Sequence, residues 1–121
     1  KGPVIVELIG DLGAGKTTFM KGVGEYFGVK EEIISPTFLI QRNYITQKGD
    51  PRNLVHIDAY RIEKPEELES LDWDKYSNDE KNIIFVEWPG NMQTPLNPNF
   101  IIEFSHETET ERKIKVKNAK E

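Results

Sequence analysis

The residues best suited to chemistry lie in the stretch GDLGAGKTTF at residues 10–19. This stretch fits the spacing G-x-x-x-x-G-K-[ST], with Gly10, Gly15, Lys16 and Thr17 at the fixed positions. Glycine tolerates positive φ, which lets backbone N–H groups turn inward around an anion. A lysine at this spacing can reach the β- and γ-phosphates of a nucleotide, and the threonine hydroxyl can ligate Mg²⁺. The spacing therefore predicts a phosphate site.

The alternative interpretation of these glycines is a flexible turn that happens to carry a lysine and a threonine. A buried-strand pattern before the stretch and a helix pattern after it favour the phosphate site. Lys16 is then a catalytic candidate, and we expect its side chain to be solvated when no phosphate is bound. The residues of this stretch expected to contact the nucleotide are Gly10, Asp11, Leu12, Gly13, Ala14, Gly15, Lys16, Thr17 and Thr18.

Two acidic residues are candidates for the second anchor that Mg²⁺ needs, which is usually an acid at the end of another apolar strand. Asp58 in LVHID and Glu87 in IIFVE each follow four mostly apolar residues, which places both carboxylates at strand ends. Solvated strand-end acids are the plain alternative for either residue. We interpret both as catalytic and metal-binding candidates. Glu87 is expected to be the more deeply buried, because its strand is the more apolar.

The elements that must position these residues follow from apolar periodicity and turn residues. The continuous apolar run in PVIVELIG is typical of a buried parallel strand, and Gly28 is a suitable stop for the helix that follows the glycines. In chain order we expect a strand at 3–10, a helix at 16–28, strands at 35–46 and 53–60, a short helix at 64–77, a strand at 81–90 and a hairpin at 99–117.

These elements predict the fold class α/β, as a P-loop NTPase-like sheet with parallel central strands, flanking helices and a C-terminal antiparallel hairpin. The loop between the strands at 35–46 and 53–60 is short enough for an antiparallel pair. The alternation in RKIKVK near the C-terminus indicates an edge strand. We expect residues 1–121 to form a single domain that lacks a short N-terminal segment.

Composition excludes several function classes. The net charge of −5 argues against a broad nucleic-acid surface, which needs clustered lysine and arginine. No apolar run approaches the roughly 18 residues of a membrane helix. The absence of cysteine excludes disulfides and thiolate metal sites, and it fits a cytoplasmic protein.

Three function classes remain for a phosphate-loop protein. A GTPase should carry an N/T-K-x-D motif after its metal-binding strand, and the nearest match, QKGD at residues 47–50, lies before both candidate strands. A small-molecule kinase usually needs several clamping arginines, and this chain has only Arg42, Arg52, Arg61 and Arg112. A nucleotide switch or ATPase that acts on a protein partner needs little beyond the phosphate site and movable loops. The sequence favours this third class, with a kinase or a non-hydrolysing nucleotide-binding module as alternatives.

Four motifs taken together, GDLGAGKTT, SPTF, HIDAYR and VEWPG, resemble the TsaE (YjeE) family of small bacterial P-loop ATPases. The resemblance implies ATP and Mg²⁺ as cofactors and a role in the threonylcarbamoyl modification of adenosine in certain tRNAs. It also implies the partners TsaD and TsaB, with tRNA reached only through their complex and with no membrane. Only Lys1 and Gly2 precede the first strand, where family members usually have a segment that helps to cover the base.

The resemblance also suggests roles for individual residues. It implies that Thr37 in SPTF lies near the γ-phosphate side of the nucleotide, and that Asp58 and Glu87 form an acidic pair for Mg²⁺ and the attacking water. His56 in HIDAYR is expected to be a packed residue rather than a catalytic one. Trp88 could line the nucleotide site or a partner surface, but we expect an ordinary packed aromatic.

Overall fold

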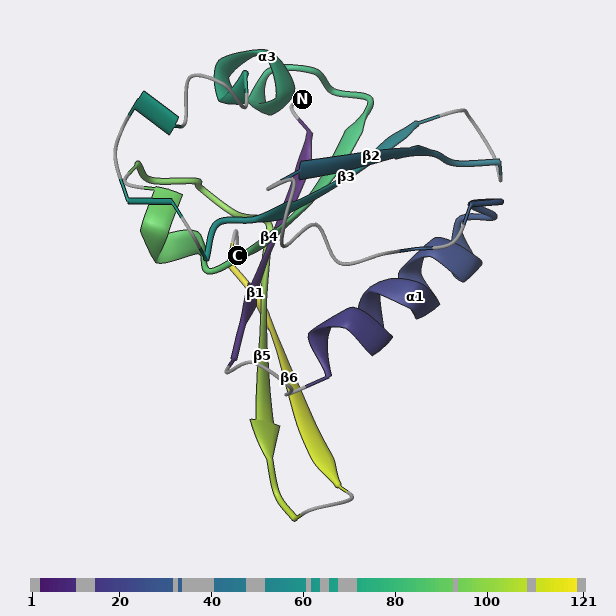
Figure 1. Cartoon of the computed structure of the whole chain (residues 1–121), viewed down its shortest axis with the longest axis vertical. Coiled ribbons are helices and arrows are strands. Elements are labelled where there is room, and N and C mark those ends of the chain that lie inside the picture. The colour runs from purple at the N-terminus through teal and green to yellow at the C-terminus, as the bar shows by residue number, and fades with distance from the viewer. Residues whose placement is uncertain are drawn as a thin grey trace.

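The computed structural model describes residues 3–10, 15–31, 33, 41–47, 52–60, 62–63, 66–67, 72–92, 94–108 and 111–119. Its elements are β1 (Val4–Ile9), α1 (Lys16–Tyr26), β2 (Gln41–Ile45), β3 (Asn53–Asp58), α3 (Trp73–Ser77), β4 (Asn82–Glu87), the 3-10 turn η1 (Pro89–Met92), β5 (Phe100–His106) and β6 (Arg112–Asn118). The strands form one sheet in the order β2-β3-β4-β1-β5-β6 (Figure 1).

The centre of the sheet is parallel and both of its edges are antiparallel. β1 pairs in parallel with β4 on one side and β5 on the other, and β3 continues the parallel run next to β4. β2 returns antiparallel beside β3, and β6 returns antiparallel beside β5 as a hairpin at the sheet edge. The predicted fold class, the antiparallel pair and the C-terminal edge strand are therefore confirmed.

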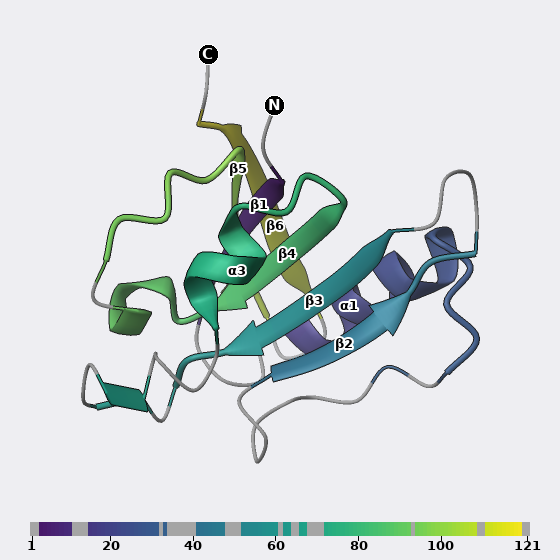
Figure 2. The same cartoon turned by 90° about the horizontal axis from the view of Figure 1, so that it is seen from above.

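The two faces of the sheet carry separate apolar clusters, because successive side chains of a strand point to opposite faces. On one face, which we call the α1 face, Val6, Leu8 and Phe85 pack with Met20 of α1. On the opposite face, the α3 face, the strands pack against Met92 of η1 and against side chains of α3. Figure 2 shows α1 behind the strands and α3 in front of them.

Helix α1 is flanked by two glycines with positive φ, Gly15 and Gly28. Gly15, at its N-terminal cap, has φ 102°, a value that a residue with a Cβ rarely adopts. Gly28 has φ 70°, and the N–H of Val29 donates to the carbonyl of Gly24 at 2.9 Å, which closes the C-terminal turn. Gly28 therefore ends this helix as the sequence predicted.

Parts of two predicted elements lie outside the described residues. The strand expected at 35–46 is observed as β2 from Gln41, and residues 34–40 are not described. The helix expected at 64–77 is observed as α3 over its last turn, Trp73–Ser77, and residues 64, 65 and 68–71 are not described. Among the helices of the described part, none is long and apolar enough to cross a membrane.

Candidate functional site

The register of β3 and β4 brings the two candidate acids together. Asp58 and Glu87 are the last residues of their strands and are direct partners in the parallel ladder. Their position at strand ends is therefore confirmed. The expectation that Glu87 is the more deeply buried is wrong, because both residues are 4% exposed. β3 is an interior strand like β4, because β2 lies on its other side.

Lys16 joins this pair from the first residue of α1. Its Nζ donates to the carbonyl of Gly10 at 2.6 Å and lies 3.6 Å from Oε1 of Glu87. The side chain is only 4% exposed, so the expectation of a solvated lysine is wrong. A backbone carbonyl and a carboxylate replace the water that the ammonium group would otherwise bind.

The second oxygen of Glu87 faces β3. Glu87 Oε2 lies 2.6 Å from Nε2 of His56, whose side chain is fully buried. His56 was expected to be a packed residue, and it is packed, but its partner is the candidate acid. Glu87 is thus held between a histidine on one oxygen and a lysine on the other.

Asp58 forms a hydrogen bond within the turn that follows β3. Its Oδ1 accepts the backbone N–H of Tyr60 at 3.0 Å, the pattern of an Asx turn. The N–H of Ala59 donates to the carbonyl of Glu87 at 3.0 Å, and Nδ2 of Asn91 donates to the carbonyl of Ala59 at 3.0 Å. These bonds join the backbone after β3 to the backbone after β4. They therefore fix the position of the Asp58 carboxylate relative to that of Glu87.

Trp88 turns the chain sharply directly after Glu87. Its φ is 57°, which is an outlier for a bulky side chain and stores backbone strain. The indole lies 4.6 Å below the Lys16 ammonium, within cation–π range, and its centroid is 5.1 Å from that of the Tyr60 ring. Trp88 also packs against the core of the α3 face. It is therefore both a packed aromatic, as expected, and a neighbour of Lys16.

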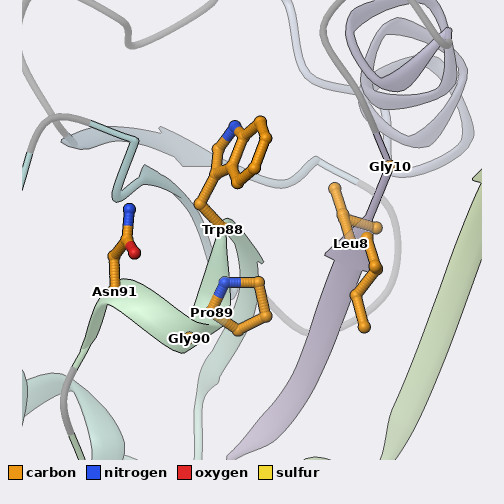
Figure 3. Close-up of a pocket in the computed structure, with 7 residues that line it drawn as sticks. Leu8, Gly10, Trp88, Pro89, Gly90 and Asn91 are labelled. Atoms are coloured by element: carbon orange, nitrogen blue, oxygen red, sulfur yellow. The ribbon is translucent and has the colours of Figure 1, made fainter.

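A pocket of about 290 Å³ opens beside this tryptophan, at the ends of β1 and β4. Leu8 and Trp88 stand on opposite sides of it in Figure 3, and the side chain of Asn91 rises from the turn beside Trp88. The residues that line it are Leu8, Ile9, Gly10, Trp88, Pro89, Gly90 and Asn91. Because Gly10 opens the glycine-rich stretch, the pocket adjoins the predicted phosphate site.

Several predicted site residues lie outside the described part of the chain. Within the described part, Thr17 and Thr18 are exposed on the first turn of α1, after Gly15. The structure does not describe the remaining loop positions Asp11, Leu12, Gly13 and Ala14, or Thr37.

The oxygen donors at this site fit Mg²⁺, which prefers carboxylate and hydroxyl oxygens. Thr17 would supply its hydroxyl, and Asp58 and Glu87 would supply carboxylates from neighbouring strand ends. Within the described residues, no group of three or more His, Asp or Glu could hold a metal ion alone. That donor set suits an ion held jointly by one or two carboxylates and by substrate phosphates.

The fold and the site define a mixed α/β protein whose glycine-rich G-x-x-x-x-G-K-T stretch connects the central strand to the first helix. The family model described as "Threonylcarbamoyl adenosine biosynthesis protein TsaE" matches residues 1–114, and the chain belongs to this family.

Individual relatives agree with this assignment. The chain is 47% identical over 85 residues to a tRNA threonylcarbamoyladenosine biosynthesis protein TsaE of Streptomyces coelicolor, covering 69% of this chain and 55% of that protein. It is 42% identical over 98 residues to the Rickettsia prowazekii protein of the same name, covering 80% of this chain and 65% of that protein. The chain thus spans between half and two thirds of the length of these two relatives.

A solved structure is similar as well. The crystal structure of Bacillus subtilis YdiB superposes with a TM-score of 0.70 at 30% identity, over 98% of this chain and 71% of that chain. The similarity over nearly the whole chain agrees with the mixed sheet described above.

The sequence pattern alone did not indicate the contact of His56 with Glu87. The two residues lie on different strands, and only the register of those strands brings them together. The signal that could have found it is the alternation of β3, which places His56 and Asp58 on one face of the sheet.

Proposed function

We propose that this chain is a Mg²⁺-dependent ATPase that supports the threonylcarbamoyladenosine modification of tRNA in a cytoplasmic complex with TsaB and TsaD. The observation that carries the proposal is the 3.6 Å approach of Lys16 Nζ to Glu87 Oε1. It joins the lysine of the glycine-rich stretch to an acid at the end of the neighbouring strand. A phosphoryl-transfer site requires both kinds of residue.

Each side chain has a distinct task in this proposal. Lys16 would donate charge-assisted hydrogen bonds to the phosphates, assisted by the backbone N–H groups of the glycine-rich stretch. Thr17 and the two acids would hold Mg²⁺, which neutralises charge on phosphate oxygens when it is bound. A carboxylate at the strand ends would also accept a hydrogen bond from the attacking water and orient it. Glu87 is our candidate for that last task, with Asp58 in support.

The proposed partners rest on family membership and agree with the charge of the chain. The family description and the names of the relatives refer to threonylcarbamoyladenosine biosynthesis. A net charge of −5 gives the chain little general affinity for nucleic acid, so we propose that tRNA is reached through the protein partners.

Incubation with ATP labelled on its γ-phosphate tests the reaction. With TsaB, TsaD and tRNA present, we expect the label to appear as free phosphate. Label transferred to a small metabolite would instead make the chain a kinase, and bound ATP without any release would make it a non-hydrolysing module. Retention of the chain by immobilised TsaB and TsaD, with and without ATP, tests the partners separately.

Lys16→Ala provides the negative control for that assay. We expect loss of phosphate release and about 10- to 100-fold weaker ATP binding, since hydrogen bonds to charged groups contribute about 1.5–3 kcal/mol. Because Lys16 is buried, the thermal unfolding of the Lys16→Ala variant must be compared with that of the wild type, to show that the variant is folded. Lys113→Ala, at an exposed position on β6, is the matched variant that should leave both activities unchanged.

A further inference from the structure

The imidazole of His56 is a buried polar group that the proposed reaction does not itself require. The side chain is 0% exposed on the α1 face of β3, where its ladder partners are Phe85 on one side and Arg42 on the other. Its Nε2 lies 2.6 Å from Glu87 Oε2, and its Nδ1 has no hydrogen-bond partner among the described residues. A carboxylate oxygen only accepts, so the hydrogen of this bond belongs to Nε2.

Packing alone does not account for a histidine at this position. The surrounding cluster includes Leu54 and Phe85, and an apolar side chain would fill the same space. Burial of a ring nitrogen without a partner destabilises the fold relative to such a side chain. The bond from Nε2 to Glu87 is the interaction that an apolar replacement would lose.

That bond determines which way the Glu87 carboxylate faces. The terminal torsion of a glutamate is broad, so a carboxylate without fixed partners can rotate. With Oε2 bound to His56, Oε1 is left on the side of Lys16, at 3.6 Å. We infer that His56 is a positioning residue that orients the Glu87 carboxylate toward the phosphate-loop lysine. This inference rests on the proposed function only in so far as Glu87 takes part in ATP hydrolysis.

The contact itself can be tested in the absence of nucleotide by proton NMR. The chain has two histidines, His56 and His106, so the imidazole N–H signals can be assigned by substitution. We expect one downfield, slowly exchanging imidazole N–H resonance in the wild type, absent in His56→Leu and shifted in Glu87→Gln. His106→Gln should leave it unchanged. A wild-type spectrum without this resonance would overturn the inference.

The consequence of the contact can be tested with two variants of similar size. His56→Gln keeps an N–H donor near the position of Nε2, whereas His56→Leu removes it. In the assembled complex we expect His56→Leu to lower kcat about 10- to 100-fold, the usual effect of removing a supporting partner. Its KM for ATP should change less than about threefold, because Lys16 and the glycine-rich stretch remain. His56→Gln should restore most of the turnover.

Two outcomes separate this inference from the proposed function. Equal turnover in His56→Leu and His56→Gln, with both variants folded as judged by thermal unfolding, would show that the donor does not matter and would overturn the positioning role. No phosphate release by the wild-type complex would reject the ATPase proposal and with it the catalytic consequence of the contact. The NMR experiment would still decide whether His56 holds Glu87.

Discussion

Glu87 Oε1 lies 3.6 Å from the ammonium group of Lys16, and both side chains are shielded from solvent. One residue begins α1 and the other ends β4, so the contact joins the helix to the parallel strand beside β1. The same carboxylate contacts His56 through its second oxygen. Glu87 therefore contacts both the lysine of the glycine-rich stretch and the histidine of the neighbouring strand β3.

Glu87→Gln and Glu87→Ala should both stop phosphate release by the assembled complex while ATP binding persists. Loss of a group that orients the attacking water typically lowers the rate about 10²- to 10⁴-fold. Glutamine can still accept a hydrogen bond from His56, so we expect it to unfold at a higher temperature than the alanine variant. Normal turnover in Glu87→Gln would assign the main role to another residue.

Asp58→Asn and Asp58→Ala separate the charge of this residue from its part in the turn. An asparagine oxygen can still accept the Tyr60 N–H, whereas alanine cannot. We expect both variants to lose phosphate release and only the alanine variant to lose about 1 kcal/mol of stability as well. A titration of Mg²⁺ at fixed ATP should show that both variants bind Mg²⁺ with a lower affinity than the wild type. A fully active Asp58→Asn would exclude the carboxylate from metal binding.

Substituting alanine for either of two glycines of α1, Gly22 or Gly24, should have opposite effects on stability. A Cβ on Gly24 would lie 2.6 Å from Cγ1 of the buried Ile33, whereas a Cβ on Gly22 would meet no atom from outside its own helical turn within 4 Å in the described part of the chain. Gly22→Ala should stabilise the protein by about 0.5–1 kcal/mol, because glycine is unfavourable inside a helix. Overpacking should make Gly24→Ala less stable than Gly22→Ala by about 1–3 kcal/mol. Urea unfolding of the two variants measures this difference.

Glu7 gives the central strand a pH-dependent contribution to stability. It is half-buried in β1 between Val86 and Ile101, and burial raises the pKa of its carboxyl above the ordinary 4.5. The folded state therefore binds the proton more tightly, so this contribution is present below pH 4.5 and is lost as the pH rises through the folded pKa. The melting temperature of Glu7→Gln, measured relative to that of the wild type, should therefore rise as the pH is raised from 4 to 7.

An exposed glutamate is the control for that experiment. Glu80 lies in the turn before β4 and is exposed. Glu80→Gln should show the same difference from wild type at both pH values. An equal pH response of the Glu7 and Glu80 variants would contradict the role of burial.

The sheet could be predicted from the sequence because each strand carries its own local signal. The apolar runs before Gly10 and Glu87 indicated buried parallel strands, and the alternation near the C-terminus indicated an edge strand. The depth of Asp58 could not be predicted in this way. Asp58 ends an interior strand because β2 lies outside β3, and the order of strands in a sheet cannot be read from the composition of either strand.

The site could be predicted only in part, for a similar reason. Lys16 could be identified as a candidate from the spacing of the glycine-rich stretch. Asp58 and Glu87 could be identified from the apolar strands that precede them. The contacts of Lys16 with Gly10 and Glu87, and that of His56 with Glu87, depend on register and on the position of α1. A local pattern contains neither quantity, which is why the lysine was expected in solvent and the histidine in an ordinary packed position.

The place of β1 in the sheet has a consequence for how the molecule is made. This strand precedes α1 in the chain, yet both of its neighbours, β4 and β5, come from much later segments. Such distant segments must meet before their contacts can contribute stability, which slows folding. During synthesis the ribosome releases Lys16 well before Glu87. A nascent chain therefore exposes its glycine-rich stretch without the acid beside it until translation has passed β4.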